Sequence, residues 1–166
     1  MDELLLDSTY LLPIFGLKVD LEDFPNLFPF LLDLHSVRYN PAALIEVKWV
    51  ILSVSKKHPR KKEAFLQAYR TGLRALEGEK RLTQTVLTTQ TIETVADDLM
   101  ERWSVKDYFD RLTYATASYS QATFLTEDSQ LLELSRTSQA PKPRATFTWR
   151  DITPSLRESQ GHPREA

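Results

Sequence analysis

The sequence predicts an α/β fold with parallel strands, and two observations lead to this expectation. The apolar run at residues 4–6 ends at Asp7, as a buried strand does when it places an acid at its carboxyl end. The β-type run at residues 122–126 is followed by Glu127 and Asp128, and helical patterns separate the two runs. Ligand sites in open parallel sheets lie beyond the carboxyl ends of the strands, so chemistry is expected at these acids.

Composition predicts one globular domain. The chain has 166 residues, of which 42% are hydrophobic and 27% charged, and its net charge of -2 argues against general coating of nucleic acid. The absence of cysteine excludes disulfides, thiolate metal sites and cysteine nucleophiles. Neither a signal peptide nor an apolar span of membrane-crossing length is visible, so we expect a soluble cytoplasmic protein without a membrane partner.

The N-terminal elements follow from short local signals. After the first strand, residues 8–14 begin a helix that Pro13 or Gly16 interrupts. Asp7 either caps this helix or belongs to a catalytic site, and the sequence around it leaves both open. The aromatic, proline-containing stretch at residues 24–32 predicts an irregular helical segment packed in the core.

A second strand and a well-marked helix come next. Residues 36–39 predict a strand, and Asn40-Pro41 predicts a helix start with Asn as the cap and Pro at the first helical position. The helix runs from residue 42 to about residue 55, and Glu46 is its one acid among apolar neighbours. Because Lys48 cannot face Glu46 on a helix, a cation from elsewhere is the natural partner of this carboxylate.

One dense basic run precedes the next helical pattern. It either forms a solvated turn between two helices or contacts phosphate, and both interpretations stay open here. Its cationic residues are Lys56, Lys57, Arg60, Lys61 and Lys62.

The second half alternates strands and helices. Residues 81–88 predict a third strand, residues 91–103 a helix, and residues 145–149 a closing edge strand. Ser104 and Asp107 resemble a capping box, with Ser104 as the N-cap of the next helix. Beyond residue 153 the polar composition predicts disorder.

Four acids are expected to converge. Two strand ends and two helices would bring Asp7, Glu46, Asp110 and Asp128 into one pocket, and carboxylates so close repel one another unless cations neutralise them. This constellation predicts a metal site. Asp107 is a rival to Asp110; the small residues after Asp110 favour the latter, because they suit close packing against the sheet.

Four stretches, LLLDST, NPAALIEVKW, DRLTYATA and ATFLTED, together resemble the PIN domain nucleases, especially the small prokaryotic, toxin-like members. The resemblance covers roughly residues 3–150. It implies a three-layer α/β/α fold with a mainly parallel sheet of about five strands. The expected organisation is a nuclease domain at residues 1–150, including a basic helical segment at residues 56–81, and a flexible tail at residues 151–166.

The resemblance also implies metal-dependent cleavage of RNA phosphodiester bonds. Asp7, Glu46, Asp110 and Asp128 would be the catalytic, metal-binding acids, supported by the hydroxyl groups of Ser8, Thr9 and Thr126. Oxygen ligands favour Mg²⁺ or Mn²⁺ over zinc. Asp7 and Asp128 would be the principal ligands, Glu46 and Asp110 would bind a second ion or its waters, and activated water would attack the phosphodiester.

Expected partners follow from the same family. They are RNA, guided by the basic arm at residues 56–81, a second copy of the chain and an antitoxin protein. Either the aromatic stretch at residues 24–30 or Trp49 would form a dimer interface, although core packing is favoured for both. The competing function is a catalytically weak PIN fold that serves as an RNA-binding or protein-interaction module.

Overall fold

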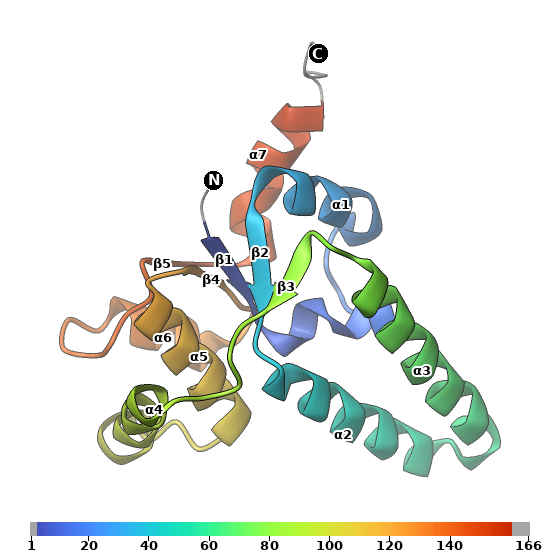
Figure 1. Ribbon diagram of the computed structural model, residues 1–166, viewed down its shortest axis with the longest axis horizontal. Helices are drawn as coiled ribbons and strands as arrows, with labels where there is room; N and C mark the ends of the chain where they lie inside the picture. The colour runs from blue at the N-terminus through green and yellow to red at the C-terminus, as the bar shows by residue number, and fades with distance from the viewer. Residues whose placement is uncertain (1–2, 161–166) are drawn as a thin grey trace.

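The computed structural model describes residues 3–160 and is built on a five-stranded parallel sheet (Figure 1). The strand order is β3-β2-β1-β4-β5, which confirms the predicted parallel sheet of about five strands. Its strands are β1 (Glu3–Leu6), β2 (Ser36–Tyr39), β3 (Leu82–Gln84), β4 (Thr123–Leu125) and β5 (Ala145–Phe147). β1 therefore lies at the centre, and all five carboxyl ends meet at one edge.

Helices cover both faces of the sheet, which confirms the three-layer architecture. One face packs against α1 (Phe24–Leu34), α3 (Lys62–Gly78) and α7 (Trp149–Gln160), and the other against α4 (Gln90–Trp103), α5 (Tyr108–Ser120) and α6 (Ser129–Arg136). The alternation of strand side chains separates the two cores, because Leu4 and Leu6 point into the first and Leu5 into the second. Within residues 3–160 no helix has the length and apolar character needed to cross a membrane.

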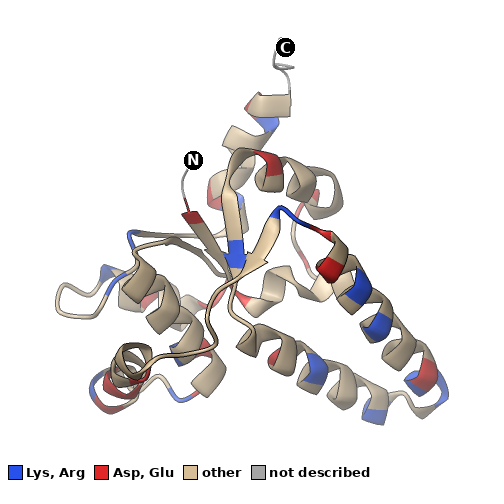
Figure 2. Cartoon of the chain, in the orientation of Figure 1, with Lys and Arg blue, Asp and Glu red and all other residues tan. Residues whose placement is uncertain are grey.

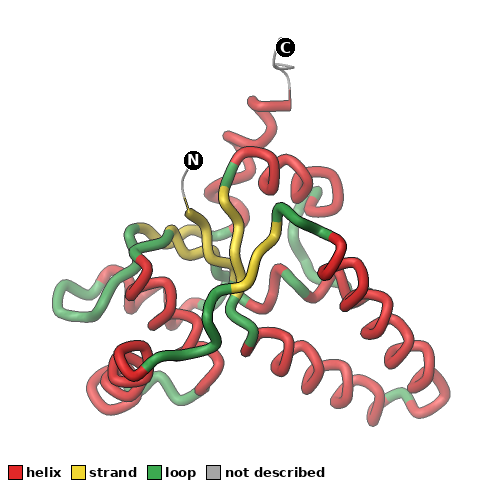
Figure 3. Tube along the Cα trace, viewed as in Figure 1, coloured by secondary structure: helices red, strands yellow, loops and turns green. Residues whose placement is uncertain are grey.

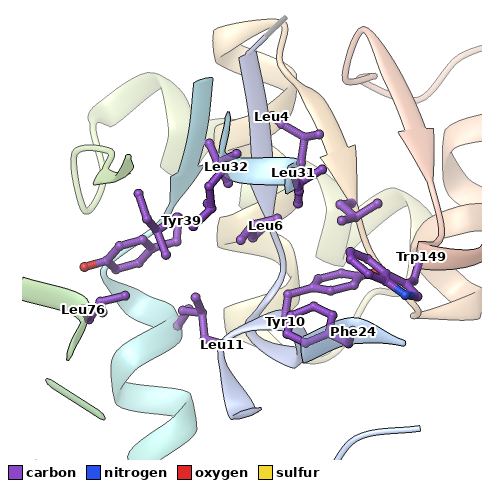
Figure 4. Close-up of a cluster of buried hydrophobic side chains, with 14 of the residues drawn as sticks. Leu4, Leu6, Tyr10, Leu11, Phe24, Leu31, Leu32, Tyr39, Leu76 and Trp149 are labelled. Carbon is purple, nitrogen blue, oxygen red and sulfur yellow. The ribbon is translucent and has the colours of Figure 1, made fainter. Parts of the chain in front are cut away.

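The first core contains a group of large aromatic side chains next to β1 (Figure 4). Phe24 packs between Tyr10 and Trp149, with ring centroids 6.3 and 4.7 Å away. The predicted core role of the aromatic stretch is therefore confirmed at Phe24 and Leu27, which are buried.

Two antiparallel helices form an arm that projects from the sheet (Figure 1). α2 (Ala42–Lys57) runs outward, the short helix η3 (Pro59–Lys61) makes the tip, and α3 runs back. The predicted helix start is shifted by one residue, since Pro41 stands before the helix. Asn40 still acts as predicted in part, because its Oδ1 accepts the N–H of Ala42 at 2.8 Å.

Two local predictions need correction. Residues 8–15 do not form one helix but two short 3₁₀ helices, η1 (Ser8–Tyr10) and η2 (Leu12–Phe15), and Gly16 ends the second with a φ of 77°. The third strand is also shorter than residues 81–88, because the chain leaves the sheet after Gln84 and crosses to α4 as a long loop (Figure 3).

The predicted capping box is wrong. Ser104 ends α4 in the left-handed conformation, with a φ of 57°, and its N–H bonds to the carbonyls of Leu99 and Met100. Asp107 is itself the N-cap of α5 and accepts hydrogen bonds from the N–H groups of Phe109 and Asp110. The capping task of Asp107 is thus confirmed, at a different position of the helix.

The prediction of a flexible tail is wrong over residues 151–160, and the fold extends beyond residue 150. These residues form most of α7, in which Trp149 and Leu156 are buried in the first core. The polar composition misled because one face of the helix is solvated while the spaced apolar side chains bury the other. The rest of the predicted tail, residues 161–166, lies outside the described part of the chain.

Candidate functional site

The site is built around Asp7, which directly follows the central strand. Its side chain is 5% exposed, and both carboxylate oxygens accept hydrogen bonds. Oδ1 accepts the N–H of Ser8 at 2.7 Å, and Oδ2 accepts the hydroxyl of Thr126 at 2.6 Å. Burial raises the pKa of the Asp7 carboxyl, and these two hydrogen bonds oppose the rise. Asp7 therefore caps η1, which is one of its two predicted roles, and it also lines an acidic pocket.

The neighbouring strand brings Asp128 to the same edge. β1 and β4 pair in parallel with Leu6 opposite Leu125, so the residues after each strand come side by side. Thr126 links them, because its hydroxyl oxygen accepts the N–H of Asp128 at 3.0 Å while donating to Asp7. The carboxylate of Asp128 also caps α6, accepting the N–H of Leu131 at 2.9 Å.

Glu46 enters the pocket from the first turns of α2. Burial raises the pKa of its carboxyl to about 7, a hydrogen bond from Ser8 opposes the shift, and the charges of Asp7 and Asp107 add to it. Lys48 is directed elsewhere, since its Nζ lies 4.3 Å from the centre of the Tyr69 ring. Lys48 therefore does not face Glu46, as predicted.

Asp110 and Asp107 enter from the first turn of α5. Burial raises the pKa of the Asp110 carboxyl to about 7, and the charges of Asp7, Asp107, Glu46 and Asp128 raise it further. Asp107 is exposed and already accepts two backbone N–H groups. The half-buried Asp110 is thus the more desolvated of the two rivals.

These side chains line one pocket of about 370 Å³. The structure brings together all four predicted acids and the predicted supporting residues Ser8 and Thr9, while Thr126 is buried behind Asp7. No lysine, arginine or histidine is among the eight described residues of this lining. The full lining is Asp7, Ser8, Thr9, Glu46, Asp107, Asp110, Glu127 and Asp128.

Glu127 also lines the pocket, although it was not among the predicted site residues. Its Oε1 accepts the hydroxyl of Tyr10 at 2.5 Å and the N–H of Trp149 at 2.7 Å. Glu127 therefore ties η1 and the start of α7 to the end of β4. Its position between Thr126 and Asp128 could have identified Glu127 as a pocket residue from the sequence. Its two hydrogen-bonding partners, Tyr10 and Trp149, are distant in sequence.

The arrangement of the acids bears on metal binding. Within residues 3–160 no group of three or more His, Asp or Glu side chains is placed so that it could hold an ion as it stands. The donor set nevertheless fits a hard cation, because it consists of carboxylate and hydroxyl oxygens gathered without a positive side chain. Asp7, Glu46, Asp110 and Asp128 would therefore have to reorient to converge on an ion.

The predicted RNA-contacting cations lie away from the pocket, at the end of the arm (Figure 2). All five are exposed, and none forms a salt bridge within the described part of the chain. They are Lys56, Lys57, Arg60, Lys61 and Lys62. The structure thus separates an acidic pocket from a basic tip along one pair of helices.

Comparisons with known proteins identify the fold. No family model matches the chain, and no curated protein does. Among solved structures, VapBC2 from Rickettsia felis, bound to a DNA fragment from its promoter, matches with a TM-score of 0.59 and 16% identity, over 89% of this chain and 98% of the other. PAE2754 from Pyrobaculum aerophilum matches with a TM-score of 0.60 and 13% identity, over 95% and 96% of the two chains. Together with the sheet order and the helix layers, these matches show that the chain has the three-layer PIN-like fold that its motifs predicted.

Proposed function

We propose that the protein is a metal-dependent endoribonuclease that acts at the acidic pocket. The observation that carries this proposal is the convergence of Asp7, Glu46, Asp110 and Asp128 from four different elements, with no cationic side chain in the lining. Carboxyl groups whose pKa values are raised to about 7 at Glu46 and Asp110 resist joint ionisation, and a bound cation would reverse this.

The proposed roles of the pocket residues differ according to their positions in the fold. We assign Asp7 and Asp128 as principal ligands, because they stand at the carboxyl ends of adjacent strands. Glu46 and Asp110 would bind a second ion or its waters from the two helices. Bound Mg²⁺ or Mn²⁺ would supply an activated water and neutralise charge that develops on the phosphate. Thr126 and Ser8 hold the carboxylate of Asp7 in place through their hydrogen bonds.

We propose RNA as the substrate and the basic tip as its first contact. Phosphate groups carry the negative charge that five exposed cations attract, whereas the acidic pocket alone would repel an RNA strand. The arm formed by α2 and α3 connects the two regions, because Glu46 lies near its base and Lys56 and Lys57 near its end.

An antitoxin partner and a homodimer also belong to this proposal. The likeness to a VapBC structure supports the toxin of a toxin and antitoxin pair as one setting for the enzyme. A general RNA-processing nuclease is the other setting.

Of the two surfaces considered for a dimer, Phe24 is buried in the core, whereas Trp49 is 66% exposed, so the core packing predicted for Trp49 is wrong.

The decisive experiment is cleavage of a mixed structured RNA pool by the pure protein with Mg²⁺, Mn²⁺ or EDTA. Cleavage is expected only with metal and is expected to disappear in Asp7→Asn and Asp128→Asn. Asp97→Asn, an exposed acid on α4, is the matched control and should cleave normally. Binding of RNA without cleavage under every metal condition would instead favour the alternative, a catalytically weak RNA-binding or protein-interaction module.

A further inference from the structure

α2 exposes an apolar stripe that the proposed reaction does not use. Trp49 is 66% exposed, Ile45 49% and Leu52 37%, all on the same helix as Glu46. A large aromatic side chain so exposed is uncommon, and exposed apolar groups that gather on one face mark interaction sites. The stripe is therefore a candidate binding surface.

Helix geometry places Trp49 on the path from the acidic pocket to the basic tip. At about 100° per residue, Trp49 lies roughly 60° around the helix from Glu46, and Lys56 lies within about 20° of Trp49. Along the axis, Trp49 follows Glu46 by about 4.5 Å and Lys56 follows Trp49 by about 10 Å. An extended molecule lying along this face would meet a carboxylate pocket, an indole ring and a cluster of cations in that order.

We propose that Trp49 is a stacking platform for a base of single-stranded RNA that leads from the basic tip to the acidic pocket. This inference rests on the proposed nuclease function and adds how the strand is held. Single-stranded nucleic acid is bound by cations that follow its phosphates together with aromatic side chains that stack on its bases. The distance from Glu46 to Lys56 is about 15 Å, which is room for about four stacked nucleotides.

Charge and area favour RNA over a second copy of the chain. The five cations at the tip continue the stripe and form no salt bridge within residues 3–160, so they complement a polyanion. Ile45, Trp49 and Leu52 together expose on the order of 300 Å² of side chain, well below the roughly 800 Å² per partner that stable protein interfaces bury.

The test measures binding of short oligoadenylate and oligouridylate RNA in EDTA, where metal-dependent cleavage cannot interfere. Trp49→Leu keeps an apolar side chain but removes the ring, and it should weaken oligoadenylate binding by about 5- to 150-fold. Trp49→Phe keeps a stacking face and should retain most of the affinity. Met100→Ala, at an exposed apolar residue of α4 outside the stripe, is the control and should bind as the unaltered chain does.

Salt dependence separates stacking from charge. Trp49→Leu should lower the affinity without changing the slope of log Kd against log salt, because stacking releases no counterions. Binding by Trp49→Leu equal to that of the unaltered chain would overturn the inference. So would a dimer in sedimentation that Trp49→Leu converts to monomer, since a second copy would then occupy the stripe. Neither result bears on the nuclease proposal, which is tested separately by metal-dependent cleavage.

Discussion

At Glu46 and Asp110, burial and like charge together move the titration of a carboxyl group into the neutral pH range. Burial raises the pKa of each carboxyl to about 7, and the other acids of the pocket add to the effect. Between the ordinary carboxyl pKa, which is 4.5 for Glu46 and 3.8 for Asp110, and this raised pKa, the folded state binds more protons than the unfolded state. The free energy of unfolding of the metal-free protein should therefore fall as pH rises through this window.

The first residue-scale prediction concerns this pH window. In EDTA, Glu46→Gln should remove part of the decline in the free energy of unfolding between about pH 4.5 and pH 7. The variant should therefore be more stable than the unaltered chain above pH 7, by roughly 1–2 kcal/mol. This figure is reduced because the Glu46 side chain is only partly buried. Urea unfolding at a series of pH values measures this. Glu101→Gln, an exposed acid on α4, should follow the unaltered chain. If the free energy of unfolding of Glu46→Gln falls with pH as steeply as that of the unaltered chain, the Glu46 carboxyl is not the cause of the decline.

The second residue-scale prediction separates Asp107 from Asp110. Asp107→Ala should lower the free energy of unfolding by about 1 kcal/mol, because the N–H groups of Phe109 and Asp110 lose their acceptor. Asp110→Asn should instead raise the stability of the metal-free protein and reduce its stabilisation by Mn²⁺, because Asp7 and Asp128 would still hold an ion. Thermal unfolding with Mn²⁺ and with EDTA compares the two. Undiminished Mn²⁺ stabilisation in Asp110→Asn would remove Asp110 from the ligand set.

At the scale of elements, α3 packs closely against η2, the short helix that follows η1. Gly72 of α3 is buried against η2, which follows η1 and hence the residues next to Asp7. A Cβ at Gly72 would lie 2.5 Å from Phe15 Cδ1 and 2.8 Å from the carbonyl oxygen of Ile14. The close approach of this helix therefore requires glycine at this position.

The element-scale prediction is that Gly72→Ala destabilises the protein by about 1–3 kcal/mol, since backbone must shift to admit the methyl group. Gly78→Ala, at the end of the same helix, is the control, because a Cβ there meets nothing within 4 Å. It should be neutral or slightly stabilising through its effect on the unfolded chain. Equal stability of the two variants in urea would contradict the close-packing account.

At the scale of the whole molecule, opposite charges are separated in space. Six acids line the pocket, while the cations of the basic run stand at the tip of the arm. A net charge of -2 conceals this separation, because the sum is nearly neutral. Any RNA that reaches the pocket must therefore be drawn in by a local field.

The whole-molecule prediction is that replacing all five tip cations with Gln weakens RNA binding and flattens its salt dependence, since fewer counterions are released. The residues are Lys56, Lys57, Arg60, Lys61 and Lys62. Unchanged binding over a salt series would show that the arm does not contact RNA. Arg136 and Arg150, which are exposed on α6 and α7 outside the arm, can be replaced together as the control pair.

The sequence by itself determined the parallel strands, the two strand-end acids and the four acids that share the pocket, because apolar runs, local caps and helical periodicity are written in neighbouring residues. It did not determine α7, the 3₁₀ turns at residues 8–15 or the exposure of Trp49. Those depend on what packs against a helix or turn once the chain has folded. Glu127 illustrates the difference, since its partners Tyr10 and Trp149 are 117 and 22 residues away and only the closed sheet brings them together.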